Sequence, residues 1–323
     1  MFVTRFGSAL AVGALLSLGA GAPVATAADM MPLKVKAPPP PEPLDIHGFV
    51  DASWKNDYIT PRGLLVTNTG VTTQVLMGLV FDAYKDKKGW ISDISFTGGV
   101  WNDFWSQQHN AVVDAWNEFD WFVSMNVKFA QNWSGGIQYI EFISPPHSFP
   151  GVERNIEFSL AYDDSPWNMT LPLHPYAKLF WAVSGPSTVV LGKAGGTFDV
   201  ELGLVPTLDL NKSGIPVVLT APTWVTVGPT TYWNNGATGC GASVFTPCAA
   251  SNAGVFSTGL TGKSPITFIP KRLGSWYVDA GFQYYHIINN SLLLAQTITG
   301  TAPNYAGAHQ DIFVGFGGIG MGF

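Results

Sequence analysis

Apolar and polar side chains alternate along much of this chain from Ile46 to its end. The clearest stretch is 119–129, where every second residue is apolar and the positions between include Asp120 and Lys128. Shorter stretches repeat the pattern at 156–162, 198–204 and 276–284. Successive side chains of a β-strand point to opposite faces, so the pattern predicts strands with one apolar face.

Turn-rich breaks separate the alternating stretches, which predict an all-β chain of about twelve strands. We expect strands at 47–58, 71–84, 90–104, 117–130, 133–144, 153–163, 173–184, 196–206, 214–228, 273–288, 291–299 and 310–323. Bacterial single-chain membrane barrels have an even number of antiparallel strands, and both termini lie in the periplasm. Twelve strands would then assign short periplasmic turns to 85–89, 131–135, 208–214 and 287–290. The longer breaks 59–70, 105–116 and 229–272 would be extracellular.

The final strand ends the chain on an aromatic residue. One face of this strand carries Phe313, Ile319, Met321 and Phe323, and the other face is rich in glycine. An alternating last strand with a terminal aromatic resembles the assembly signal of outer-membrane barrels. The resemblance implies that the barrel-assembly machinery is a partner during insertion.

The N-terminus predicts export. A positive charge at Arg5, an apolar run over 9–18 and the small residues Ala25-Thr26-Ala27 are typical of a secretory signal peptide. We therefore expect three parts: a cleaved signal peptide at 1–27, a Pro-rich periplasmic segment at 28–45 and the barrel at 46–323. A membrane anchor is disfavoured because the apolar run is shorter than the roughly 20 residues that a spanning helix needs.

Composition favours a membrane protein. Charged residues make up 12% of the chain, against about 25% in an average soluble domain. Because no later stretch is suited to a spanning helix, a membrane-embedded chain would have to be a closed barrel, which pairs every backbone polar group. We therefore predict a transmembrane antiparallel up-and-down β-barrel in the bacterial outer membrane, in contact with its lipid. A secreted β-sandwich remains the alternative.

The first strand and the loop after it carry Asn56-Asp57-Tyr58 and then Arg62-Gly63, followed by a second alternating stretch with Gln74 and Gly78. This arrangement resembles the TorF-like porins of proteobacteria, and the similar layout extends over most of the mature chain. The resemblance implies an outer-membrane porin of unassigned substrate. The Cys-containing loop and the Pro-rich spacer depart from the family pattern.

The polar faces of the strands would line the interior if the apolar faces contact lipid, because charges facing hydrocarbon are costly. Acidic residues then outnumber basic ones among the expected lining residues, which favours cations. The expected pore-lining residues are Asp93, Asp120, Lys128, Glu157, Lys178, Asp199, Glu201 and Asp279. An open narrow pore and an interior plugged by paired charges both fit this pattern, since clear aqueous channels belong to wider barrels.

Two loops carry candidate functional groups. Asp57, Tyr58 and Arg62 would lie at the extracellular mouth, where they could orient a solute or simply cap the loop. Cys240 and Cys248 predict one loop disulfide, since a pair of cysteines in an oxidising compartment is most simply bonded. Neither cysteine has a nearby histidine, so no metal site is expected.

The resulting functional prediction is a porin-like channel for passive diffusion of small polar or cationic solutes. A plugged barrel that binds a partner at its surface is the first alternative, and an enzyme acting on lipid is the second. No catalytic motif supports an enzyme; His147-Ser148 is the one neighbouring His–Ser pair. No cofactor is predicted, and the net charge of −6 argues against nucleic acid. Oligomeric state is left open.

Overall fold

The computed structural model describes residues 45–323 apart from 87, 108–113, 146–151, 168, 185, 188–191, 194–195 and 234–250. The expected signal peptide and nearly all of the Pro-rich segment therefore lie outside the described residues. So do Cys240 and Cys248, and the disulfide stays a prediction.

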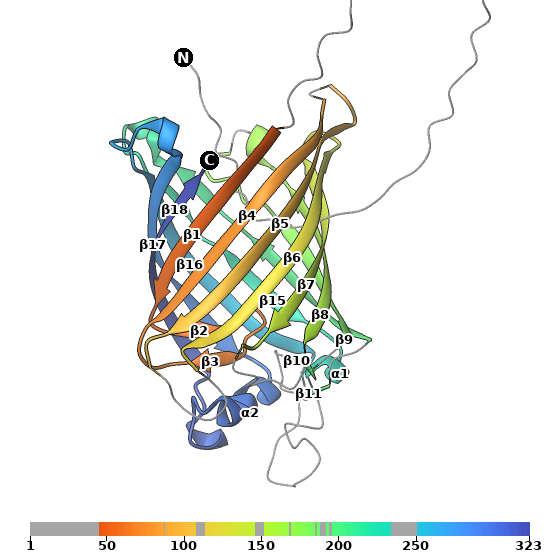
Figure 1. Cartoon of the computed structure of the whole chain (residues 1–323). Helices are drawn as coiled ribbons and strands as arrows, with labels where there is room; N and C mark the ends of the chain where they lie inside the picture. The colour runs from red at the N-terminus through yellow and green to blue at the C-terminus, as the bar shows by residue number, and fades with distance from the viewer. Residues whose placement is uncertain are drawn as a thin grey trace, which may run out of the picture.

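Twelve antiparallel strands close into a barrel, as the alternating pattern predicts (Figure 1). In order around the wall they are β1 (Asp45–Lys55), β4 (Thr72–Lys85), β5 (Ile91–Trp105), β6 (Trp116–Phe129), β7 (Trp133–Ile143), β8 (Glu153–Tyr162), β9 (Tyr176–Ser184), β12 (Thr197–Leu204), β15 (Thr223–Val227), β16 (Ala253–Pro265), β17 (Ser275–Ile287) and β18 (Asp311–Gly322).

The first and last strands close the wall. β1 pairs with β18 in a continuous register from Phe49 opposite Gly322 to Lys55 opposite Phe316. Two backbone bonds between Gly48 and Phe323, of 2.8 and 3.0 Å, extend this ladder to the last residue of the chain. Closure leaves no free edge among the twelve described strands of the wall, which is the condition for placing strands in lipid.

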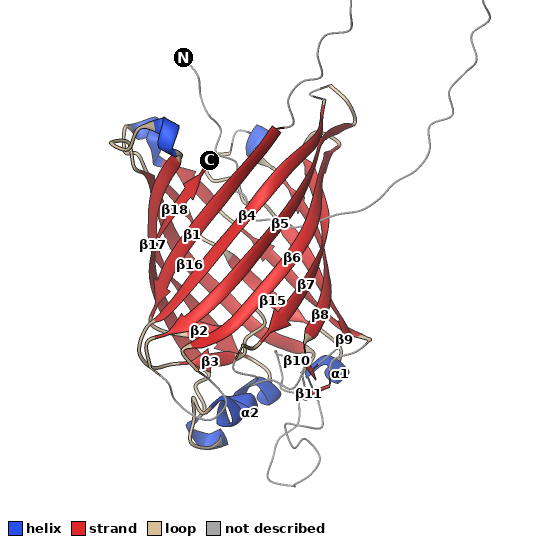
Figure 2. Cartoon of the chain, viewed as in Figure 1, coloured by secondary structure: helices blue, strands red, loops and turns tan. Residues whose placement is uncertain are grey.

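Two short hairpins and two α-helices lie at one end of the barrel (Figures 1 and 2). We call it the loop end; the opposite end, with Asp45 and Phe323, is the turn end. The loop-end elements are β2 (Tyr58–Ile59), β3 (Leu65–Thr67), β10 (Pro186–Ser187), β11 (Gly192–Lys193), α1 (Thr230–Trp233) and α2 (Asn290–Thr299). Within the described part of the chain, no helix is long and apolar enough to cross a membrane.

Two of the sequence-based assignments were wrong. The expected strand 291–299 is the helix α2, because Asn289 caps its start through Ser291 N and Gly300, in the left-handed region, ends it. The expected loop 229–272 contains strand β16, whose small inward residues, among them Ser257, obscure the alternation. The total stays at twelve, but residues 287–290 move from the expected periplasmic turns to the loop end.

In the hairpin after β12, two strands of the described wall are interrupted at prolines. Here β13 (Thr207–Asp209) and β14 (Val218–Thr220) continue the lines of β12 and β15 past Pro206 and Pro222. Proline has no backbone N–H to donate to a ladder, which interrupts each strand. The backbone bond from Ala221 N to Pro206 O, of 2.9 Å, holds the two breaks opposite each other.

The outer face is apolar, as expected of a wall facing lipid. Large apolar side chains are exposed there on consecutive strands, including Trp54, Met77, Leu79, Phe96, Val123, Leu160, Trp181, Leu202, Phe256, Leu260, Val278, Phe282 and Phe313. Two tryptophans near the loop end of β5 do not belong to this face. Trp101 packs against the buried cluster at the loop end, and the ring nitrogen of buried Trp105 donates to Asp103.

Inside the barrel, aromatic rings lie over glycines of the neighbouring strand. The directly opposed pairs are Phe49 with Gly78, Phe122 with Gly99, Tyr176 with Gly203, Tyr277 with Gly320 and Phe316 with Gly281. A Cβ atom added to any of these glycines would come within 2.9 Å of the opposed ring. Each glycine therefore provides the space in which a ring lies against the wall, an arrangement also used to rescue glycine in designed sheets.

Substitution of neighbouring glycines in β5 tests this packing. Gly99→Ala would bring Cβ to 2.5 Å from the Phe122 ring and 2.7 Å from the Met77 carbonyl, whereas a Cβ on Gly98 meets nothing within 4 Å. We expect Gly99→Ala to lower the free energy of unfolding by about 1–3 kcal/mol and Gly98→Ala to leave it nearly unchanged. Urea unfolding midpoints in lipid vesicles measure both, and equal midpoints would contradict the packing account.

Candidate functional site

The segment between β1 and β4 folds into the barrel at the loop end. Tyr58, Ile59 and the run 64–66 are buried in an apolar cluster with residues of α1, α2, β16, β17 and β18. Thr299 Oγ1 donates to Leu65 O over 2.9 Å and ties α2 to β3. The mouth at this end is therefore covered by packed protein, made of the inserted segment and the two helices.

A tight turn forms the tip of the inserted segment. Thr60 N donates to Leu64 O over 2.9 Å, and Leu64 N donates to Thr60 Oγ1 over 3.1 Å. Gly63 has φ +95°, a conformation that favours glycine, and an added Cβ would lie 3.0 Å from both Leu292 and Val255. This turn directs the side chain of Arg62 into the barrel.

Arg62 is buried, with 5% of the residue exposed. Its guanidinium carbon lies 4.8 Å from the centre of the Phe180 ring and 5.4 Å from that of Phe142. Nη1 is 3.9 Å from Glu157 Oε1. Nε has no hydrogen-bond partner among the described residues. The guanidinium is thus held by two aromatic faces and one long ion pair, and its hydrogen-bonding capacity is incompletely used.

Buried carboxylates surround this part of the lumen. They project inward from β5, β6, β8 and β12, and they are Asp103, Glu118, Asp120, Glu153, Glu157, Asp199 and Glu201. The inward cations at this level are Arg62, Lys55 and Lys178. Negative charge therefore exceeds positive charge among the described residues that line the loop-end half of the lumen.

Several of these carboxylates have identifiable donors. Glu118 Oε2 accepts from the Tyr58 hydroxyl over 3.0 Å. Glu201 Oε1 accepts from Lys178 Nζ over 3.0 Å and from the Tyr176 hydroxyl over 2.8 Å. Asp199 differs from these acids, because neither of its carboxylate oxygens has a hydrogen-bond partner among the described residues. Tyr58 of the inserted segment thus bonds directly to a lumen-facing acid, which couples the cover of the mouth to the wall.

A second group of charges lies nearer the turn end. Tyr277 donates its hydroxyl hydrogen to Asp51 Oδ2 over 2.6 Å, and Lys263 Nζ is 3.3 Å from the centre of the Tyr277 ring. Asp279 stands opposite Lys263 in the β16–β17 ladder. Across the lumen, Lys128 Nζ is 3.9 Å from Asp93 Oδ2. In this group the numbers of acidic and basic side chains are closer to equal than in the group around Arg62.

The expected lining residues all belong to inward-facing positions of the ladders. Glu157 and Asp199 lie around Arg62. Asp93 pairs with Lys128, and Lys178 pairs with Glu201. Asp279 lies nearer the turn end, opposite Lys263. Sequence reasoning missed Asp103, Glu118, Glu153 and Lys55. Asp103 lies an even number of residues after Asp93 in one strand, so strict alternation would have found it.

The three residues expected at the extracellular mouth differ in how deeply they are buried. Arg62 and Tyr58 are buried within the barrel, with Arg62 5% and Tyr58 8% exposed, whereas Asp57 is only partly buried. Their role in contacting solute stays a prediction. The pair His147-Ser148 lies outside the described residues.

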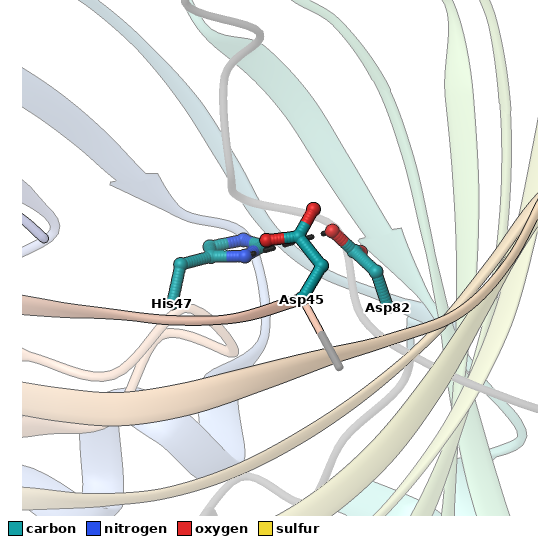
Figure 3. Close-up of side chains that lie close together, drawn as sticks. All are labelled: Asp45, His47 and Asp82. Carbon is teal, nitrogen blue, oxygen red and sulfur yellow. Dashed lines mark ion pairs between the residues drawn. The ribbon is translucent and has the colours of Figure 1, made fainter. Parts of the chain in front are cut away.

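One cluster with metal-ligand residue types lies at the turn end, where His47 and Asp45 of β1 face Asp82 of β4 (Figure 3). His47 Nδ1 is 3.6 Å from Asp82 Oδ2. Lys85 Nζ lies 2.7 Å from Asp45 Oδ2 and 2.6 Å from Asp82 Oδ2. Because the lysine ammonium bridges both carboxylates, the cluster works as an ion-pair network.

A similar group, Asp163, Asp164 and His174, shapes the turn between β8 and β9. Asp164 accepts two backbone N–H bonds, from Leu173 over 2.9 Å and from His174 over 3.0 Å. Burial by itself raises the pKa of Asp164, but these two backbone donors outweigh it and hold the pKa below its usual value. The carboxylate thus stabilises the loop as an anion.

Some ion pairs face outward instead of inward, among them Glu141 with Arg154. Glu141 and Arg154 stand opposite each other near the loop ends of β7 and β8, with Nε 2.9 Å from Glu141 Oε1. Tyr139 and Trp121 also donate to Glu141, over 2.7 and 3.1 Å. Three donors on one carboxylate supply the hydrogen bonds that lipid cannot.

Comparison with known proteins assigns the chain to no family. No family model matches the chain, and no curated protein does. Among solved structures, an outer membrane channel from Pseudomonas putida F1 is 9% identical, with 86% of this chain and 95% of that chain covered and a TM-score of 0.46. Pseudomonas putida OprB (9%, covering 87% and 94%, TM-score 0.38) and Salmonella typhi OmpF (8%, covering 87% and 97%, TM-score 0.33) also match.

Replacing Asp164 tests its role in the turn. A carboxyl whose folded pKa is depressed adds stability above its unfolded pKa, and that stability is lost as pH falls through the folded pKa. Wild type should therefore be more stable than Asp164→Asn at neutral pH, and the difference should shrink in acid, below the normal aspartate range near 4. Urea unfolding across pH measures this; a difference that stays constant into acid would contradict it.

Proposed function

We propose that this protein is an outer-membrane channel for small polar or cationic solutes, constricted by the inserted segment 56–71. The observation that carries the proposal is the excess of inward-facing buried carboxylates around Arg62. Rings of carboxylates favour cations in channels. The resemblance to TorF-like porins agrees with this assignment, and so does a sequence that predicts an exported protein.

Location in the outer membrane is supported by the wall itself. A closed ladder with large apolar side chains on its outer face suits a hydrocarbon environment. Aromatic pairs near both ends of the strands, such as Trp90 with Phe129 and Trp116 with Phe104, suit the two interfaces of a bilayer.

A plugged barrel that acts at the cell surface is the second candidate, and the packed loop end favours it. Leu64, Leu65 and Leu292 are each at most 1% exposed, so the cover of the mouth is a hydrophobic core. In this alternative the segment 56–71 is a permanent plug and the helices present a binding surface. The two candidates differ in whether ions pass through the wild-type protein while the segment is in place.

Charge selectivity tests the channel. In a planar bilayer under a salt gradient, we expect discrete conductance steps and a reversal potential on the cation-selective side. Neutralising two lumen acids together, Asp199→Asn with Glu201→Gln, should move that potential toward zero, because it lowers the negative charge of the lumen. The matched control removes two exposed charges elsewhere, Asp114→Asn with Asp163→Asn, and should leave the potential unchanged. Anion selectivity in wild type would overturn the proposal.

Shortening the inserted segment tests the constriction. Replacing residues 59–67 by a short glycine linker removes Arg62 and the buried leucines from the mouth, so single-channel conductance should rise several-fold over wild type. Heat-modifiable mobility in detergent gels checks that the shortened protein still forms a barrel. A folded barrel that conducts ions only after the segment is removed would instead favour the plugged alternative.

A further inference from the structure

Arg62 is a side chain of the inserted segment, yet it occupies a site built by the wall. Phe142 and Phe180 come from β7 and β9, and Glu157 comes from β8 between them. Asp199 of β12 and Glu153 of β8 add negative charge close by. Four consecutive strands thus form a cage around a group that the loop supplies. We call these five wall residues the cation cage.

The chemistry of the cation cage selects a particular kind of cation. Two aromatic faces near a cation favour weakly hydrated, delocalised charge, and guanidinium meets both conditions. Carboxylates offer planar acceptors that match the N–H groups of guanidinium. A hydrated sodium ion gains little from aromatic faces, so the cage distinguishes organic from inorganic cations.

The hold of the cage on Arg62 is incomplete. The closest carboxylate oxygen is 3.9 Å from Nη1, beyond ordinary hydrogen-bond length, and Nε is unpartnered among the described residues although Arg62 is 95% buried. A free solute could adopt the hydrogen-bond geometry that the turn at 60–64 denies to Arg62. Arg62 therefore fills the cage without saturating it.

We propose that the cation cage is a binding site for solutes with a guanidinium group and that Arg62 is its built-in competitor. This deepens the proposed channel function, on which its biological meaning rests, by naming a solute class. A guanidinium solute that enters the cage would displace Arg62, and the segment 56–71 would lose the charge contact that anchors its tip. Binding itself requires a folded barrel but no conduction.

The test uses the refolded protein in detergent with methylguanidinium as the probe and Arg62→Ala as the variant. Removing Arg62 should open the cage, so methylguanidinium should raise the Tm of Arg62→Ala in a saturable way, on the order of 3–5 °C at ten times its dissociation constant. Wild type should respond less, because Arg62 competes. Sodium chloride at equal ionic strength should give no saturable rise, and methylammonium should give a smaller one than methylguanidinium.

Two further variants separate the cage from general effects. Arg272→Ala removes an exposed arginine at the turn end and should respond to methylguanidinium as wild type does. Adding Glu157→Gln to Arg62→Ala should weaken the apparent affinity for methylguanidinium about tenfold, because one charged partner in the cage is lost. A response that this change leaves intact would place binding elsewhere and overturn the proposal.

Folding of the variant is checked by heat-modifiable mobility. If Arg62→Ala folds only when methylguanidinium is present, that rescue supports the cage directly. Arg62→Gln, which replaces the guanidinium by a neutral amide, is the second variant. Its Tm is measured in the same methylguanidinium titration. A folded variant without a saturable response overturns the proposal, as does failure of both variants to fold with the probe present. Silence in the bilayer would count against the channel alone.

Discussion

Backbone pairing around a closed wall is the constraint on which this structure depends. In hydrocarbon an unpaired backbone group has no water to bind, so every strand needs two neighbours. The β1–β18 ladder, extended by Gly48 and Phe323, satisfies the strands that would otherwise be edges. Once the wall is closed, alternation assigns each side chain to lipid or lumen. Apolar residues then face outward, and nearly all charges must find partners inside.

The interior meets that demand in two ways. Toward the turn end, acids and bases are paired or neighbouring, and rings over glycines fill space without adding charge. Toward the loop end, carboxylates predominate, and the inserted segment brings Arg62 and Tyr58 to them. A buried charge without a partner is strongly unfavourable. The segment 56–71 is therefore part of the electrostatic structure of the lumen as well as its cover.

The loop-end cover and the lumen charges are consequently one system. The turn that carries Arg62 packs through Gly63 against Leu292 of α2 and Val255 of β16, so motion of the tip would disturb the apolar cluster. A channel constricted here would respond to whatever competes for the acids around Arg62. The same contacts, if never released, would make a permanent plug. How tightly the cation cage binds Arg62 decides whether the segment 56–71 can be released, as in a channel, or stays in place, as in a permanent plug.

The sequence alone determined the barrel and the direction of most side chains, because a period of two is local and survives in every strand with contrasting faces. The expected total of twelve strands agrees with the structure only because the missed strand β16 offsets the strand wrongly expected at 291–299. The sequence-based prediction failed where the two faces of a segment differ little in polarity. Strand β16 has small residues on its inner face, which hides its alternation. The segment α2 has consecutive leucines, and it is a helix that begins after the cap at Asn289 and ends at Gly300. Only the tertiary structure decided that Arg62 lies inside among acids of four strands. These contacts join residues that are far apart in the chain, so the local alternation of apolar and polar residues cannot reveal them.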